Sequence, residues 1–267
     1  MGVSYGPKKN VKATNYILRV NDDNGEVIDE EKINDFYNFV RNNDIYNDLF
    51  FAHTHKYSGY TKDSSEKIQK IYDLSSGNRD YDKESVNNQP TFVQNGILTE
   101  SNQGLQRNYV TNNGTIPGLE SNGYLFLKVI NHQNDENDKT LFQARDIGGV
   151  PSGLFSLNTI HNINNTFDFR ISDGSATDTN IGFNYNEDYN IVLYKTNSDL
   201  IINVNSVNYN IGNVNWLGEV VFESEAITML YNSTVHGPNS NTISSGLIII
   251  NGSNIVESNF ENVFNLM

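Results

Sequence analysis

Residues 200–211 read LIINVNSVNYNI and carry the clearest sign of the fold. Apolar side chains recur at every second position on both sides of Asn205-Ser206; they are Leu200, Ile202 and Val204 before this pair and Val207, Tyr209 and Ile211 after it. A period of two places side chains on one face of a β-strand, and Asn and Ser are typical turn residues. The stretch therefore predicts a β-hairpin with one buried face.

Similar segments follow one another along most of the chain after residue 90. Phe167, Phe169 and Ile171 alternate with Asp168 and Arg170, as in a half-buried strand. Other short runs are rich in β-branched or aromatic residues and lie between turn residues; they are 124–130, 141–144, 154–160, 190–194, 219–222, 226–230 and 247–250. About ten strands with hardly a helix between them predict antiparallel pairing in two stacked sheets.

Helical spacing is restricted to segments near the two ends. One helix is expected to begin after the N-cap Asp29, with apolar residues at Ile33, Phe36, Tyr37 and Val40. Residues 256–264 return to the same spacing and predict a short C-terminal helix. We therefore expect an all-β sandwich with a short N-terminal helical segment and a short C-terminal helix.

The domain organisation is expected to be simple. Residues 1–27 offer little to bury and include a strong turn at 21–25, so we expect an N-terminal arm that could attach the protein to a larger assembly. The chain contains no internal repeat and no Pro-rich or Gly/Ser-rich linker, and residues 28–267 are expected to form one β-sandwich domain.

Composition excludes several classes of function. The 32 acidic and 18 basic side chains give a formal charge of −14, which disfavours binding to nucleic acid and to anionic membranes. The chain has no cysteine, which removes disulfides, thiolate catalysis and cysteine-ligated zinc. No run is long enough for a transmembrane helix, and the first residues lack the apolar core of a signal peptide, so neither a membrane span nor export by that route is expected.

Three stretches carry a resemblance to a known family. They are INDFYNFVRNNDIYNDLFFAHTH at 33–55, YDLSSGNRDYDKESVNNQPTFVQNGIL at 72–98 and GLIIINGSNIVESNFENVFNLM at 246–267. In this order they resemble the concanavalin A-like or laminin-G-like jelly roll of tailed-bacteriophage fibre, tail and decoration proteins. Residues 100–245 match that family only in their pattern of strands.

The resemblance implies a function. It predicts a non-enzymatic structural component of a virion, located in the particle and assembled with other virion proteins and with further copies of itself, a trimer being usual for a fibre. It also implies contact with host surface glycans. Two alternatives stay open: a stand-alone carbohydrate-binding module or lectin, and a glycoside hydrolase.

Residues 73–84 form an acidic, turn-rich loop. The resemblance implies a structural role for Asp73, Ser75, Gly77 and Asn78, whose side chains would satisfy local backbone groups. Calcium binding is the alternative, because Asp73, Asp80, Asp82 and Glu84 cluster carboxylate oxygens. Their spacing does not fit an EF-hand, and no metal site is predicted.

Acidic residues near 219–225 are the best candidates for glycosidase chemistry. Glu219, Val221, Glu223 and Glu225 would share one face of a strand, although Val221 and Ser224 stand where a laminarinase-type motif needs acids. The sequence also lacks a Gly-x-Ser-x-Gly elbow and the glycine patterns of nucleotide-binding loops. We therefore predict no catalytic residues, no cofactor and no cofactor-binding residues.

Histidines and aromatic residues leave further options open. His53 and His55 would project to one side of a strand, as metal ligands or as ordinary structural residues. Sugar binding needs exposed rings, which could come from Trp216, Tyr109, Tyr185, Tyr189 or Tyr231. Aromatic side chains in a sandwich are more often core, and no binding site is assigned to them.

Overall fold

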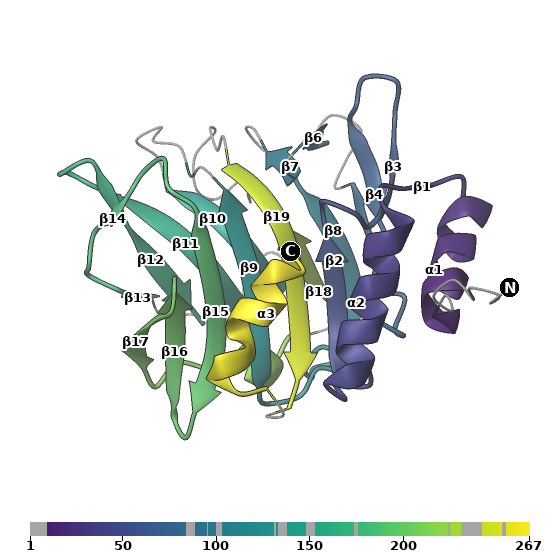
Figure 1. Ribbon diagram of the computed structural model, residues 1–267. Coiled ribbons are helices and arrows are strands. Elements are labelled where there is room, and N and C mark those ends of the chain that lie inside the picture. Colours follow the sequence, from purple (N-terminus) through teal and green to yellow (C-terminus); the bar gives the residue numbers. More distant parts are fainter. Residues whose placement is uncertain are drawn as a thin grey trace, which may run out of the picture.

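The computed structural model is a sandwich of two antiparallel sheets with helices along one side (Figure 1). It describes residues 10–267 except 84–88, 95, 100–102, 131, 133–137, 148–152, 174–175, 224, 231–241 and 253–254. The fold class predicted from the sequence is confirmed. Among the described residues, no helix is long and apolar enough to cross a membrane.

The first sheet contains eleven of the described strands. Their spatial order is β1 (Glu26–Val27), β3 (Gly59–Lys62), β4 (Ile68–Ile71), β5 (Tyr81–Lys83), β8 (Leu105–Val110), β18 (Glu225–Leu230), β10 (Lys139–Asp146), β11 (Leu154–Asn162), β12 (Thr166–Ser172) and β13 (Ala176–Asp178), with β14 (Phe183–Asn184) also paired to β12.

The second sheet contains eight described strands. Their order is β17 (Val207–Gly212), β16 (Asp199–Val204), β15 (Tyr189–Thr196), β9 (Gly123–Ile130), β19 (Thr242–Asn251), β7 (Gly96–Thr99) and β6 (Thr91–Val93), with β2 (Leu49–Thr54) also paired to β19. The predicted hairpin is β16–β17, in which Val204 pairs with Val207 and Ile202 with Tyr209.

Both faces of the second sheet are buried. In β19, Leu247 and Ile249 contribute to the core between the sheets, whereas Ile248 and Ile250 face a second apolar cluster on the outer side. Strand β9 shows the same alternation, with Leu127 inside and Phe126 outside. A sheet with two apolar faces needs a covering layer on each.

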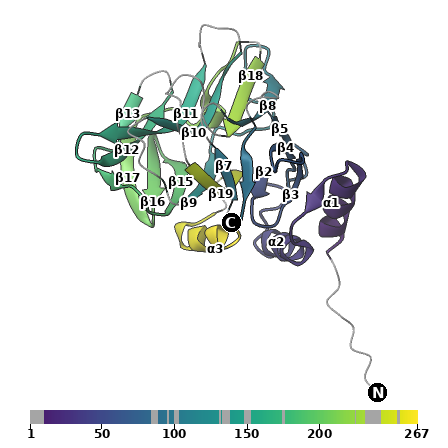
Figure 2. The same ribbon diagram turned by 90° about the horizontal axis from the view of Figure 1, so that it is seen from above.

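Helices lie along that outer side, as Figure 2 shows, with two of them over the second sheet and the first one beside strands β1 and β3 of the first sheet. They are α1 (Val11–Asp22), α2 (Glu30–Asn42) and α3 (Phe260–Asn265). The predicted N-cap of α2 is confirmed, since the Asp29 carboxylate accepts hydrogen bonds from the backbone N–H groups of Glu31 and Lys32 at 3.0 and 3.1 Å. Phe126 contacts Phe260 and Phe264 of α3 edge-on, with ring centroids 5.4 and 5.6 Å apart.

Helix α1 was not expected from the sequence. Its buried residues Ala13, Tyr16, Ile17 and Val20 have helical spacing, but the exposed apolar residues Val11 and Leu18 obscure that pattern in the sequence. It packs so closely on β3 that a Cβ atom at Gly59 would lie 2.6 Å from Val20 Cγ2. The division into an arm at 1–27 and a domain at 28–267 stays a prediction, although residues 11–22 are part of the packed helical layer.

Other differences concern strands. The strand expected at 219–222 does not form: Leu217–Glu219 is a turn of 3-10 helix, held by a hydrogen bond from the Trp216 N–H to the Glu219 carboxylate at 2.6 Å. Strands β1, β3, β4 and β5 lie before residue 90, where no clear strand pattern was found. They are two to four residues long, too short to display a period of two.

The hydroxyl of Tyr16 gives a test of how α1 is attached. It accepts a hydrogen bond from the Gly59 N–H at 2.7 Å and donates one to the Tyr72 carbonyl at 3.3 Å. We expect Tyr16→Phe to lower the free energy of unfolding by about 1–3 kcal/mol, because a buried N–H loses its partner. Urea unfolding measures this, and Tyr209→Phe is the control, since no hydrogen bond of that hydroxyl occurs within the described residues. Equal stability of the two variants would contradict the assignment.

Candidate functional site

The loop after β4 is a structural turn, as the sequence suggested. The buried carboxylate of Asp73 accepts hydrogen bonds from the backbone N–H groups of Ala52, Ser75 and Arg79 at 2.8–3.0 Å and from the Ser75 hydroxyl at 2.5 Å. Burial raises the pKa of Asp73, and these hydrogen bonds oppose that rise. Its oxygens therefore bind the protein's own backbone.

Asp80, the second acid of this loop, also binds groups of the protein itself. Arg19 donates to both its carboxylate oxygens at 2.8 and 2.9 Å, and Lys70 lies 3.3 Å away. No group of three or more metal-binding side chains occurs among the described residues. The calcium alternative thus finds Asp73 and Asp80 already occupied, and Glu84 lies outside the described residues.

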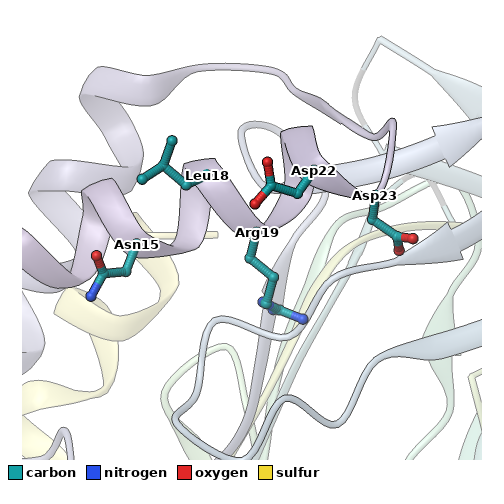
Figure 3. Close-up of a pocket in the computed structure, with 5 residues that line it drawn as sticks. All are labelled: Asn15, Leu18, Arg19, Asp22 and Asp23. Carbon is teal, nitrogen blue, oxygen red and sulfur yellow. The ribbon is translucent and has the colours of Figure 1, made fainter.

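The outer side of α1 carries a broad, open hollow of about 510 Å³. Figure 3 shows Arg19 leaving the helix toward the strands below it, while Leu18 and Asp22 point away. Asp23 accepts hydrogen bonds from Lys70 and from the Tyr72 hydroxyl, both at 2.7 Å. Arg19 and Asp23 thus attach α1 to β4 and to the loop that follows it, so their charges are not available to a ligand.

Substitution of Asp73 tests whether the loop is a structural turn. We expect Asp73→Ala to lower the free energy of unfolding by about 3–5 kcal/mol, because two buried N–H groups and a partly buried one lose their acceptor at once. Asp63→Ala is the matched control: its carboxylate also accepts from two backbone N–H groups, of Ser65 and Lys67, but in an exposed turn. Chemical denaturation of both variants measures these losses. If Asp73→Ala lowers the free energy of unfolding by less than Asp63→Ala does, the loop is not held by the Asp73 carboxylate.

The predicted acidic face does not form. Glu219 lies in the 3-10 turn, where its carboxylate oxygens accept hydrogen bonds from Lys195 at 2.6 and 2.9 Å. Glu223 and Glu225 are exposed, and only Glu225 belongs to a strand. The expected alignment of carboxylates on one strand was therefore wrong, because the segment turns before β18 begins.

Histidines and aromatic rings fill the interior. His53 and His55 are both buried, with ring centroids 4.7 Å apart, and burial lowers the pKa of His53 to about 4 and that of His55 well below its ordinary value. The rings considered for sugar stacking, Trp216, Tyr109, Tyr185 and Tyr189, are buried, and Tyr231 lies outside the described residues. None of these described rings offers an open face to a sugar.

Buried neutral histidines make stability depend on pH. The pKa of His53 is lowered to about 4 and that of His132 to about 3, so the unfolded chain takes up protons first as the pH falls below about 6.5. Their stabilising contribution is complete above pH 6.5 and is lost toward pH 4. At pH 5 we expect a loss of about 2 kcal/mol per histidine relative to pH 7.

Denaturant unfolding at several pH values checks this. His132→Phe keeps an aromatic ring against Phe167 and Tyr185, whose centroids lie 4.5 and 5.6 Å from the His132 ring. Between pH 7 and pH 5, the free energy of unfolding of the variant should fall by about 2 kcal/mol less than that of the parent, which is the contribution expected of one histidine. An identical loss would show that His132 does not titrate in this way.

A more promising site lies at the turn between β11 and β12. This polar hollow of about 600 Å³ is lined by His161, Asn162, Ile163, Asn164, Thr166, Asp168, Asn180, Ile181 and Gly182. Ile163 is 99% exposed at the tip of the turn, and Ile181 is 43% exposed. Sequence reasoning missed this site; its signal was an isolated apolar residue within the polar turn HNINNT.

Asp168 organises the polar hollow. Its carboxylate accepts hydrogen bonds from the backbone N–H groups of Ile181 and Gly182 at 2.7 and 2.9 Å, and from the Asn162 side chain at 2.9 Å. Burial acts to raise the pKa of Asp168, but these hydrogen bonds outweigh it and leave the pKa below its ordinary value. The carboxylate is ionised at neutral pH and fixes the two loops that form the rim.

Comparisons with known proteins give a likeness of fold. A scan against protein-family models and a search of curated proteins found no match. A Trypanosoma rangeli sialidase bound to sialic acid has a TM-score of 0.56 at 15% identity, covering 81% of this chain and 32% of the sialidase. Another T. rangeli sialidase structure gives 0.53 at 13% identity, covering 88% and 38%. The shared feature is a β-sandwich.

The chain spans about a third of the length of the sialidase chains that it matches. A laminarinase catalytic domain from Thermotoga maritima is also similar, with a TM-score of 0.40 at 7% identity, covering 63% of this chain and 82% of that domain. The likeness to the sialidases supports the β-sandwich part of the resemblance drawn from the sequence. None of the similar structures named here is of a phage protein.

These findings correct the predicted function. A non-enzymatic structural component of a tailed-phage virion was expected, but the structures with a similar fold are of sialidases, which are carbohydrate-active enzymes. The prediction that the chain is not an enzyme is contradicted by the same finding, and a lectin acting alone gains no support. Location in a virion and assembly with virion proteins or with further copies of the chain stay untested predictions.

Proposed function

We propose that this chain is the carbohydrate-binding part of a carbohydrate-active enzyme, and that the polar hollow at the β11–β12 turn holds the sugar. The proposal rests on one observation: amide, carboxylate and hydroxyl groups line the same hollow as the exposed side chain of Ile163. The likeness of fold to a third of a sialidase chain supports it.

The chemistry of the hollow suits a sugar. A pyranose ring presents hydroxyl groups that both donate and accept hydrogen bonds, and Asn amides do the same. Asn162 and Asn180 line the hollow from two separate segments, and each already donates one hydrogen bond that holds its position, to Asp168 and to the Asp178 carbonyl. Ile163 and Ile181 add apolar surface for the C–H groups of the ring.

Charge narrows the class of sugar. The lining contains the ionised carboxylate of Asp168 and no lysine or arginine. An acidic sugar would therefore meet like charge, with no cation to offset it, on a chain whose formal charge is −14. We propose a neutral oligosaccharide, of which one or two rings would fill a hollow of this size.

Binding to an array of neutral and acidic glycans, followed by calorimetry on the best neutral ligand, tests the proposal. We expect Ile163→Ser to weaken neutral-glycan binding about ten-fold, through loss of apolar contact, without changing stability. Val207→Ser is the matched control, because Val207 is also an exposed apolar residue at a hairpin turn, 51% exposed on β17.

The outcomes separate the possibilities. If neutral glycans fail to bind, or if Val207→Ser weakens binding as much as Ile163→Ser does, the polar hollow is not the sugar site. Mass spectrometry of the bound glycan after incubation reports cleavage. Turnover would contradict a purely binding role and direct attention to catalytic groups of this chain.

A further inference from the structure

A second hollow lies on the opposite, helical side of the second sheet, beside α2 and the end of α3, where Figure 1 places the C-terminus. Its volume is about 440 Å³. We call it the basic hollow, since three lysines line it: Lys32 of α2, Lys56 from the turn after β2 and Lys128 of β9. In a chain with 32 acidic and 18 basic residues, three lysines at one hollow form a local reversal of charge.

Lys56 and Lys128 form the charged centre of the basic hollow. Neither ammonium group makes an ion pair or a hydrogen bond to a carboxylate within the described part of the chain. Burial lowers the pKa of Lys128, and the nearby charge of Lys56 lowers it further, while Asp188 acts weakly in the opposite direction. The positive charges of Lys56 and the half-buried Lys128 repel each other, and a bound anion would offset this repulsion.

The hydroxyl of Tyr57 is a third donor at this place. Tyr57 lines the basic hollow and is only 5% exposed, and its hydroxyl has no hydrogen-bond partner of normal geometry among the described residues. Thr54 lies near it, but the Thr54 hydroxyl bonds that of Ser58 at 3.0 Å. A buried hydroxyl without a partner costs stability unless a ligand or water completes it.

The acids around the basic hollow do not neutralise this pair. The carboxylate of Asp29 is occupied by the N-cap of α2. Asp35 lies 3.6 Å from Lys32 on the same helix, so these two charges offset each other. Three lysines against two aspartates leave the lining side chains with one positive charge in excess.

We propose that the basic hollow binds a small oxyanion, a carboxylate or sulfate group, with the ammonium groups of Lys56 and Lys128 and the hydroxyl of Tyr57 as its donors. Charge-assisted hydrogen bonds from lysine to such groups are stronger than those between neutral groups. This site is independent of the polar hollow, which lies at the β11–β12 turn and contains no lysine or arginine.

Thermal unfolding of the full chain in sodium sulfate and, separately, in sodium acetate tests the proposal, with sodium chloride at equal ionic strength as the reference. Sulfate also stabilises proteins in general through exclusion from their surface, and that effect does not saturate with concentration. We expect an additional, saturable rise in Tm. Lys56→Gln and Lys128→Gln should each weaken the saturable binding about ten-fold, and the double variant should abolish it.

Two controls make the result specific. Lys62→Gln removes a lysine that pairs with Glu66 elsewhere on the surface, at 2.5 Å, and should leave the saturable rise unchanged. Tyr57→Phe should reduce anion binding without lowering the Tm in chloride, because the lost hydroxyl has no partner. By contrast, Tyr37→Phe should lower the Tm in chloride, since that hydroxyl donates to the Leu74 carbonyl at 2.8 Å.

A direct readout comes from lysine side-chain NMR. Bound anion should raise the pKa of Lys128 toward or above its ordinary value, because it offsets both burial and the charge of Lys56. The proposal is overturned if neither salt gives a saturable rise in Tm, or if the rise persists in the double variant. A response to sulfate alone or to acetate alone identifies which oxyanion the site prefers.

Discussion

The structure depends on a sheet that is apolar on both faces. Strands β9 and β19 lie side by side at its centre, with Leu127 paired to Leu247 and Phe126 to Ile248. The first pair faces the core between the sheets and the second faces the helices. Because that outer face would otherwise be exposed to water, the apolar residues of α2 and α3 that cover it stabilise the sheet.

The buried turn at Asp73 links strand β2 of the second sheet to helix α1. Its carboxylate holds the backbone of β2 through the Ala52 N–H, while its own carbonyl accepts from Arg19 of α1 at 2.7 Å. Asp80 accepts both from Arg19 and from the Asp73 N–H, at 2.9 Å. The carboxylates of Asp73 and Asp80 are thus satisfied by groups of the protein itself.

How far the sequence could predict this structure depended on the length of each pattern. Long alternating strands such as β12 and the β16–β17 hairpin were found, and so was α2 with its cap at Asp29. Short strands such as β3 and β5 show no periodicity, and the turn of Leu217–Glu219 depends on a hydrogen bond between Trp216 and Glu219 that no local pattern reveals. The polar hollow could not be predicted because 161–168 and 180–182 meet only through strand pairing.

Opposite charge at the two hollows follows from where each lies on the sandwich. The polar hollow is formed by turns at one end of the first sheet, where Asp168 is needed to satisfy the backbone N–H groups of Ile181 and Gly182, so a negative charge is part of its framework. The basic hollow is formed where β9 meets the helical layer, and there the acids Asp29 and Asp35 are used by α2 itself. Lys56 and Lys128 make no corresponding ion pair with a carboxylate among the described residues. A chain that is acidic as a whole therefore presents a negative site that suits neutral ligands and a positive one that suits anions, and each charge is set by what the neighbouring backbone requires.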